Sequence, residues 1–574
     1  MPTLLREAAL QHGDRLLLVA DGERLSFVEA ERRSAELARG LLADGVGKGE
    51  RIGLLLPNGV DWAICFFAIG RIGAIAVALN TFWQAPELAY ALRDADVARL
   101  ITAPSFRGHD YLERLETAIG GLATARGDRA LALTSHPYLR QIRQVGDAAR
   151  GWLRGSVEEL SLLGAPARVG DARCEGSEWG GPPASVALIS NGGEPGERAP
   201  TPDLLPEIES EVRAADWLAI VYSSGSTASP KGVVHSHGAI VRQAEAMAAV
   251  YELGPDERLY SPMPFFWVGG FVVSLLGPLA SGAALLTHAA FDPEKTLDLL
   301  ETERATVVIG WPHFARAMVE HETFAGRDLS TIRRGSMLDL LPEAARPRDP
   351  QMRSNSLGMT ETCGPHAAAP PGTGELPEHL RGAFGRGVPG IEHRIVDPKT
   401  RAVLASGVSG EIEVRGSTVL QGLYKKEREE VFTRDGFYPT GDAGHLSEDG
   451  WLFFEGRLGD VIKTGGANVS PAEVEAALSA LPGVAQAWVV GIPDEDRGER
   501  VAAALVAAAE TVLDVAQIRV ALRVQLSSYK IPGYFRICRA DELPFTDSGK
   551  IRRAELALFL AEGARRREAT EPIG

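Results

Sequence analysis

The chain has 574 residues, of which 45% are hydrophobic, and this length predicts a multi-lobed body with at least one smaller domain. Its formal net charge of −16 argues against nucleic-acid binding, because a phosphate backbone is bound by a basic surface. The four cysteines are widely spaced and the first residues contain no signal-peptide run, so we expect a cytoplasmic protein without a zinc cluster or a disulfide framework.

The first half of the chain has the pattern of an α/β protein. Apolar runs at 51–57 and 74–80 predict strands, and the amphipathic stretch 27–45 predicts a helix. This alternation is typical of a mostly parallel sheet covered by helices. Between about 151 and 211 the composition changes to Gly, Pro, Glu and Ser, which predicts surface loops or an insert.

Residues 259–291 contain no Asp, Glu, Lys or Arg. The segment is long enough to span a bilayer, but three prolines and several glycines interrupt it. We therefore expect a buried loop, helix and strand of a large α/β core rather than a membrane span.

The last third of the chain changes pattern twice. After about Gly382, short strand-like runs separated by turns, such as 410–416, predict a small β-rich subdomain. From about Leu458, two helical patterns and two apolar strand patterns alternate, which predicts a compact α+β domain.

The stretch 223–232, SSGSTASPKG, follows an apolar run at 217–222 and so is expected at the carboxyl end of a strand, where α/β sheets bind ligands. Its hydroxyls, backbone amides and Lys231 could hold a phosphate. The spacing is not that of a Walker loop, and composition alone leaves an ordinary Ser/Gly turn equally open. Lysine is scarce, with nine lysines among the 60 Lys and Arg residues, which favours a specific use for Lys231.

A series of motifs then occurs in order along nearly the whole chain, at 222–237, 262–271, 356–362, 410–416, 438–442, 456–475 and 543–553. This ordered series resembles the adenylate-forming (AMP-binding) superfamily, on its acyl-CoA synthetase, fatty-acid–CoA ligase-like branch. The resemblance implies an α/β multi-domain fold. Residues 1–457 would form a large N-terminal domain of two α/β subdomains plus a small β-rich subdomain, and residues 458–574 a small, mobile α+β C-terminal domain.

The resemblance implies a two-step reaction, in which a carboxylate attacks the α-phosphate of ATP and the thiol of coenzyme A then displaces AMP. It implies phosphate contacts from the loop and Thr360, a Mg²⁺ ligand in Glu361, ribose contacts from Asp442 and Arg457, and catalytic stabilisation of the transferring groups by Lys550. The loop residues are Ser223, Ser224, Gly225, Ser226, Thr227 and Lys231.

For the second step, the resemblance implies that the C-terminal domain rotates about a hinge just after Arg457. The loop 463–471 would then border the tunnel for the pantetheine arm of coenzyme A. Lys463 would contact the cofactor, and Gly465 and Gly466 would allow its close approach.

Four departures from the family pattern fall in the adenylation half. Ala228 replaces a glycine of the phosphate loop, Leu357 replaces the aromatic residue that stacks on adenine, and 335–338 replaces a Gly-Gly-Ala-Pro stretch. Trp267 occupies a position often held by histidine. We expect the acyl pocket near Trp267, Gly269, Gly335 and Met337.

Two main interpretations of the function follow. The first is a complete acyl-CoA synthetase that acts on a bulky or unusual carboxylic acid, with ATP, coenzyme A and Mg²⁺. The second is a ligase with impaired adenylation that completes the thioesterification of an acyl-AMP supplied by a separate adenylating enzyme. A non-catalytic acyl- or nucleotide-binding relative and a luciferase-type oxidase remain further alternatives. Free coenzyme A is the expected acceptor, since no carrier domain is attached.

Overall fold

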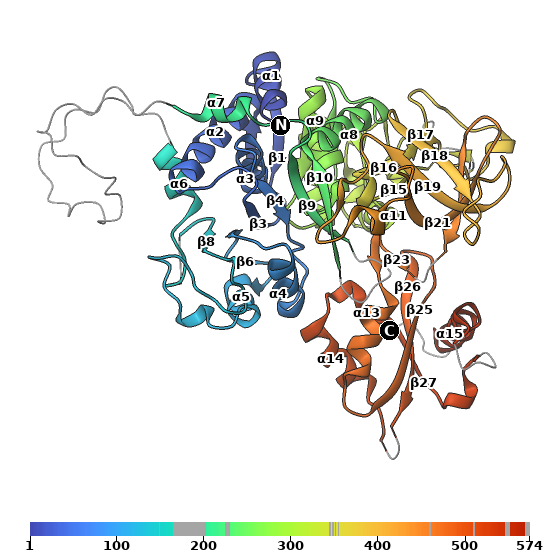
Figure 1. Cartoon of the computed structure of the whole chain (residues 1–574). Helices are drawn as coiled ribbons and strands as arrows, with labels where there is room; N and C mark the ends of the chain where they lie inside the picture. The colour runs from blue at the N-terminus through green and yellow to red at the C-terminus, as the bar shows by residue number, and fades with distance from the viewer. Residues whose placement is uncertain are drawn as a thin grey trace, which may run out of the picture.

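A computed structural model describes residues 1–147, 150–164, 203–223, 230–343, 346, 349, 352–353, 355–458, 461–508, 511–545 and 551–568. Figure 1 shows a broad N-terminal body, coloured blue to yellow, and a smaller C-terminal lobe, coloured orange to red, on one side of it. The segment from about 151 to 211 that was predicted as loops or an insert lies mostly outside the described residues.

The first sheet of the body has seven strands in the order β20-β10-β9-β4-β3-β5-β8. The strands β9, β4, β3, β5 and β8 are parallel, and β10 and β20 continue the sheet through antiparallel pairs. The predicted apolar runs form β3 and β4, and the predicted helix is α2, which begins with a Ser26–Glu29 capping box. The bounds are β3 (Arg51–Leu55), β4 (Ile75–Ala78), β5 (Arg99–Thr102), β8 (Gln141–Gln144), β9 (Trp217–Ser223), β10 (Lys231–Ser236), β20 (Gly422–Leu423) and α2 (Phe27–Ala43).

The second sheet contains the segment without charged residues. Its order is β14-β13-β11-β12-β1-β2, and 259–291 supplies parts of β11, a buried loop and helix, and β12. None of the described helices is long and apolar enough to cross a membrane. The bounds are β1 (Leu16–Ala20), β2 (Glu23–Ser26), β11 (Arg258–Tyr260), η2 (Gly269–Leu276), α9 (Gly277–Ser281), β12 (Ala284–Thr287), β13 (Val307–Val308) and β14 (Arg334–Gly335).

Further helices cover these two sheets and connect their strands. Their bounds are α1 (Pro2–His12), α3 (Val60–Arg71), α4 (Ala85–Asp94), α5 (Tyr111–Ala118), α6 (Val157–Gly164), α7 (Leu205–Ser210), α8 (His237–Val250), α10 (Pro293–Thr302) and α11 (Pro312–Val319). The large buried core of the body includes Trp62, Phe66 and Phe271, whose rings contact one another. Burial of such large apolar side chains is the main source of stability for the body.

The predicted β-rich subdomain is an antiparallel sheet in the order β18-β19-β21-β22, and a smaller sheet, β15-β16-β17, lies before it in the chain. Alternating burial along β21 places one face of this sheet on a core and the other toward solvent. The bounds are β15 (Leu357–Met359), β16 (Gly364–Ala368), β17 (Arg386–Gly387), β18 (Ile391–Val396), β19 (Gly410–Gly416), α12 (Arg428–Val431), β21 (Tyr438–Leu446) and β22 (Leu452–Arg457).

The C-terminal lobe has a five-stranded sheet with helices, and its own apolar cores. Its α+β character agrees with the sequence pattern, while the predicted division at 457/458 stays a prediction. The β23–β24 hairpin of this lobe extends toward the body near α11 (Figure 1). The bounds are β23 (Ile462–Thr464), β24 (Ala467–Val469), α13 (Pro471–Ser479), β25 (Val484–Asp494), β26 (Gly498–Ala507), α14 (Val515–Gln525), β27 (Tyr534–Ile537) and α15 (Arg553–Glu568).

Candidate functional site

A cavity of about 1440 Å³ lies between the body and the C-terminal lobe. Its walls come from the ends of β9, β13 and β14, from β15, and from the β23–β24 hairpin. Ligand pockets are commonly about 300–1,000 Å³, so this space exceeds what one small ligand needs. The lining includes eight residues predicted from the sequence: Ser223, Trp267, Gly269, Gly335, Leu357, Thr360, Lys463 and Gly466.

The predicted phosphate end of the cavity is built where β9 ends and β10 begins. Ser223 and Lys231 are directly paired across these two strands. The Ser223 hydroxyl donates a hydrogen bond to Glu361 Oε1 at 3.2 Å, and Glu361 is only 8% exposed. Ser224, Gly225, Ser226 and Thr227 lie outside the described residues.

The short turn that carries Thr360 and Glu361 is held from two sides. His235 Nε2 donates to the backbone oxygen of Thr360 at 2.8 Å, and Leu420 donates its N–H to the backbone oxygen of Glu361 at 2.8 Å. Burial lowers the pKa of His235 to about 4, so the ring is neutral at physiological pH and can keep this donor role. Thr360 therefore faces the cavity from a fixed backbone.

The predicted ribose pair occupies adjacent strands of the β-rich subdomain. Asp442 on β21 is directly opposite Arg457 on β22. Asp442 is 2% exposed, and its backbone N–H donates to Thr440 Oγ1 at 3.0 Å. Asp442 does not line the cavity, and only the backbone of Arg457 is described.

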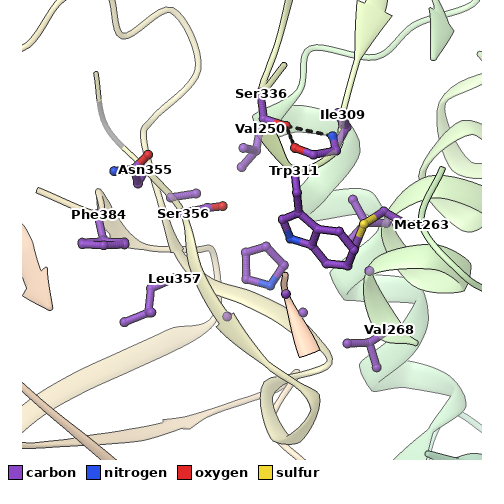
Figure 2. A pocket seen from close by; sticks show the side chains of 18 of the residues that line it. Val250, Met263, Val268, Ile309, Trp311, Ser336, Asn355, Ser356, Leu357 and Phe384 are labelled. Carbon is purple, nitrogen blue, oxygen red and sulfur yellow. Dashed lines mark hydrogen bonds between the residues drawn. The ribbon is translucent and has the colours of Figure 1, made fainter. Parts of the chain in front are cut away.

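Leu357, which replaces the expected aromatic residue, has an aromatic neighbour. Phe384 packs against the same apolar cluster as Leu357 and also lines the cavity. The backbone N–H of Asn355 donates to Ala383 O at 3.2 Å, which fixes the two segments side by side. Figure 2 shows Phe384 and Leu357 on the same side of the cavity, and Phe384 meets Phe454 edge-on at 5.6 Å.

The residues that were expected near the acyl pocket divide into two groups. Trp267 and Gly269 line the cavity next to η2, and Gly335 lines it at the end of β14. Met337 is fully buried and lies behind the wall, since a Cβ added at Gly310 would be 3.1 Å from Met337 Sδ. The wall itself is fixed by Ser336 Oγ, which accepts from Gly310 N–H at 2.9 Å and donates to Gly310 O at 2.7 Å (Figure 2).

The C-terminal lobe contributes Lys463 and Gly466 through the β23–β24 hairpin. Lys463 Nζ lies 4.6 Å from the centre of the Phe454 ring. Gly465 and Gly466 have φ values of +54° and +80°, in the left-handed region that favours glycine. Gly466 lies against Trp311, whose indole projects into the cavity in Figure 2.

Lys550 lies outside the described residues, but its flanks are placed. Phe545 and Ile551 form an isolated bridge, and Phe545 packs edge-on against Trp488 at 5.3 Å. Both belong to an apolar cluster of the C-terminal lobe, and neither lines the cavity.

The sequence analysis did not identify several residues that line the cavity. Trp311 follows the apolar run of β13, so its place at the end of a strand was a usable signal. Phe384 and Phe454 carry no motif signal. Asn80 and Lys530 line the cavity from segments 450 residues apart in the chain, and no local pattern shows such a contact.

Among solved structures, the amide bond synthetase McbA from Marinactinospora thermotolerans matches with a TM-score of 0.74 and 25% identity, covering 97% of this chain and 99% of that one. A feruloyl-CoA synthase from an Amycolatopsis species is 31% identical over 554 residues, which cover 96% of this chain and 95% of that protein. An indoleacetate–CoA ligase from Aromatoleum aromaticum is 28% identical over 561 residues, which cover 97% of each chain.

Family models match both parts of the chain. The model of the AMP-binding enzyme matches residues 5–424, and the model of the AMP-binding enzyme C-terminal domain matches residues 473–550. Together with the shared fold, these matches confirm the resemblance on which the sequence analysis rested. The chain belongs to the AMP-binding enzyme family.

Proposed function

We propose that the protein is an acyl-CoA ligase that joins a carboxylic acid to coenzyme A through an acyl-adenylate, with ATP as the source of the adenylate. The observation that carries this proposal is one cavity lined by Ser223 and Thr360 from the body and by Lys463 and Gly466 from the C-terminal lobe. The curated relatives reported above are named as CoA ligases or synthases, which favours this reaction over a non-catalytic or oxidative role.

For adenylation, we assign the phosphate end of the cavity to ATP. Ser223 presents a hydroxyl beside Glu361, and Lys231, at the start of β10, is paired with Ser223 and is assigned as the cation of this end. These donors suit anionic oxygens, and charge that develops on the α-phosphate would be stabilised by such pre-positioned groups. Asp442 and Arg457, which are paired on adjacent strands, are assigned to the ribose.

Glu361 is the proposed ligand for Mg²⁺. Its carboxylate is nearly buried beside Ser223, and one carboxylate together with phosphate oxygens is a common Mg²⁺ arrangement. The donor set therefore fits the ion. When bound, the ion would neutralise charge on the phosphates. The protein's own contribution is the fixed backbone on both sides of Glu361.

For thiolation, we assign the β23–β24 hairpin to the pantetheine arm of coenzyme A. The hairpin meets the cavity in the present arrangement, whereas the flanks of Lys550 pack within the C-terminal lobe. We infer that this arrangement serves the second step, and that the lobe rotates to bring Lys550 to the cavity for the first. The expected hinge just after Arg457 contains Gly459, which lies outside the described residues. A glycine would accept the change of backbone angle.

The acid is proposed to be bulky and uncharged at its distal end. The part of the wall formed by η2, the segment before it and the end of β13 is apolar, with Met263, Trp267, Val268 and Ile309. Burying an unpaired charge there would be costly. The named substrates of the two CoA ligases above are aromatic acids, which suits a cavity lined by Trp267 and Trp311.

A screen of carboxylic acids with ATP, Mg²⁺ and coenzyme A tests the proposal, with release of AMP and formation of the CoA ester as readouts. We expect an aromatic or other bulky uncharged acid to give both products. The Lys550→Ala variant should lose AMP release from acid and ATP but keep ester formation from synthetic acyl-adenylate and coenzyme A.

The same experiment separates the alternatives. CoA ester from the synthetic adenylate alone, with no AMP from any acid and ATP, would support a ligase that depends on a separate adenylating enzyme. No ester under either condition would contradict ligase activity altogether.

A further inference from the structure

A buried ion cluster joins the two lobes beside the cavity. Lys530, in the short helix η9 (Ser528–Lys530) of the C-terminal lobe, has a side chain that is only 1% exposed. Its Nζ donates to Glu87 Oε1 of the body at 2.7 Å and to Glu473 Oε1 of its own lobe at 2.7 Å. The ammonium therefore bridges α4 of the body and α13 of the lobe.

Two further contacts fix the same junction. The Ser527 hydroxyl lies 3.1 Å from Glu87 Oε1 and 2.9 Å from Glu87 Oε2, and can donate to this carboxylate. Asn80 Nδ2 donates a long hydrogen bond of 3.4 Å to the Tyr529 hydroxyl. Three residues of 527–530 thus meet the body, at Asn80 and at Glu87 in the first turn of α4.

The cluster holds one ammonium between two carboxylates. Burial acts to lower the pKa of Lys530, but Tyr529 and the two carboxylates outweigh it and the pKa is raised, so the group stays an ammonium. Burial raises the pKa of Glu473, and Lys530 partly offsets that rise. A buried ammonium with two carboxylates is satisfied, whereas removal of one partner leaves a poorly solvated charge.

The contacts of the two carboxylates with Lys530 differ in whether they depend on how the lobes are arranged. Glu473 belongs to the same lobe as Lys530 and would remain beside it wherever the lobe moves. Glu87 belongs to the body, so its contact with Lys530 exists only when the lobes are placed as they are here. Asn80, Tyr529 and Lys530 also line the same cavity as Lys463 and Gly466.

We propose that Glu87 and Lys530 form a clasp that holds the C-terminal lobe in the arrangement used for thiolation. Glu87 is then a positioning residue for the second half-reaction, and this role rests on the ligase reaction proposed above. Rotation of the lobe toward the adenylation arrangement must break the clasp, so its strength sets the balance between the two half-reactions.

Glu87→Gln tests the clasp, with Glu473→Gln as the matched control. Glutamine is preferred to alanine at 87, because Glu87 Oε2 also accepts from the Gln84 N–H at 2.8 Å and caps α4. Adenylation is measured from acid and ATP with hydroxylamine as the trap, and thiolation in a single turnover from synthetic acyl-adenylate and coenzyme A.

We expect Glu87→Gln to lower the ratio of thiolation rate to adenylation rate by about tenfold or more, as for other close charge pairs at interfaces. Glu473→Gln removes the other carboxylate charge beside the Lys530 ammonium. Because that contact lies within one lobe, the ratio should stay near that of the wild type. General destabilisation would lower both rates together and leave the ratio unchanged.

A distance measurement gives a second readout that needs no turnover. Spin labels on Ala123→Cys in the body and Val520→Cys in the lobe, both exposed positions, report the interlobe distance. Cys174, which lies outside the described residues, is replaced by serine, whereas the other three cysteines are buried and are kept. Glu87→Gln should broaden the distance distribution and Glu473→Gln should not. Should the glutamine variant at 87 lose stability, Ser527→Ala supplies a milder test, because it removes a donor to the Glu87 carboxylate and leaves every charge paired.

Two results would overturn the clasp: an unchanged rate ratio together with an unchanged distance distribution in Glu87→Gln, or equal shifts in Glu87→Gln and Glu473→Gln. Failure of the ligase proposal looks different, because the wild type would then form no CoA ester while the distance distribution would still respond to the variants.

Discussion

Gly466 lies against the indole of Trp311 so closely that a Cβ added at Gly466 would fall 2.0 Å from Trp311 Cζ2. Trp311 precedes α11 of the body, and Gly466 lies between the strands of the β23–β24 hairpin in the C-terminal lobe. The contact therefore exists only in this arrangement of the lobes, which makes it a second point, besides the Glu87–Lys530 clasp, where the arrangement can be tested.

Replacement of Gly466 by alanine should block the second half-reaction selectively. The added methyl group would overlap the indole, and such overpacking typically costs about 1–3 kcal/mol. We expect the single-turnover rate from synthetic acyl-adenylate and coenzyme A to fall at least about tenfold, while adenylation trapped by hydroxylamine is retained.

Gly465→Ala is the matched control, because Gly465 also has a positive φ, while a Cβ there would meet only His313 Cε1, at 3.9 Å. Gly465→Ala should lower the single-turnover thiolation rate less than Gly466→Ala does. In Gly466→Ala, a second change, Trp311→Ala, should restore part of the thiolation rate. Equal losses at both glycines would point to backbone strain and contradict the role given to Trp311.

Phe384 should supply the aromatic contact to adenine that Leu357 lacks. The two side chains share one cluster at the cavity wall, and base–aromatic stacking is worth about 1–3 kcal/mol. Phe384→Leu should therefore raise the KM for ATP by about 5- to 150-fold. It should also weaken the binding of synthetic acyl-adenylate, which carries the same adenine, while the thiolation rate at saturating adenylate changes little. Steady-state kinetics with varied ATP provides the measurement.

The reciprocal exchange, Leu357→Tyr with Phe384→Leu, should recover much of the lost affinity, since it returns the ring to the position usual in the family. If Phe384→Leu leaves the KM for ATP unchanged, adenine does not contact this ring, and the departure at Leu357 has another explanation.

The sequence predicted the parts of the site that depend on local pattern. Ser223 and Thr360 were found because motif order and strand ends locate them, and both line the cavity. The parts that depend on distant contacts were missed. Glu87 and Lys530 are 443 residues apart, and a lysine or a glutamate at either position has no local feature to set it apart from a solvated charge.

The same limit applies to the apparent loss of an aromatic residue at Leu357. Sequence alone showed the departure, but the antiparallel β15–β16–β17 sheet is what brings Phe384 beside it. Met337 was expected near the acyl pocket together with Gly335, yet it lies in a separate core behind Gly310. Neighbours in sequence need not face the same cavity.

Stability should fall as the solution is acidified from pH 7 to pH 4, and His235 should account for part of the loss. Burial lowers the pKa of His235 from 6.5 to about 4, so between these values the unfolded chain binds a proton that the folded chain does not. The stabilisation is complete above pH 6.5 and is lost as the pH falls toward 4. At pH 5 the loss should be about 2 kcal/mol.

Urea unfolding at pH 7 and pH 5 measures this effect. His235→Gln can keep a donor to the Thr360 carbonyl but cannot titrate in this range, so it should lose less stability between the two values than the wild type does. An identical pH dependence in wild type and variant would exclude a contribution from His235.

Gly269 and Gly335 both line the cavity, but alanine should act at them in different ways. At Gly269 a Cβ would meet only the flexible end of Met263, at 2.9 Å, so the fold should accept it and the cavity should narrow. At Gly335, where φ is +143°, a Cβ would fall 1.8 Å from the backbone oxygen of Val308, which cannot move aside. Gly269→Ala should alter the selectivity among carboxylic acids, and Gly335→Ala should destabilise the body.

Kinetics over a series of acids of increasing size, together with thermal melting, distinguish the two effects. Gly269→Ala should lower kcat/KM for bulky acids by about tenfold while sparing short acids, since a lost methyl-sized space costs about 1–3 kcal/mol, and its Tm should stay near that of the wild type. Gly335→Ala should lower the Tm and the activity with every acid. A uniform loss for all acids in Gly269→Ala would mean that the wall at η2 does not contact the acyl group, because a steric limit must act more strongly on larger substrates.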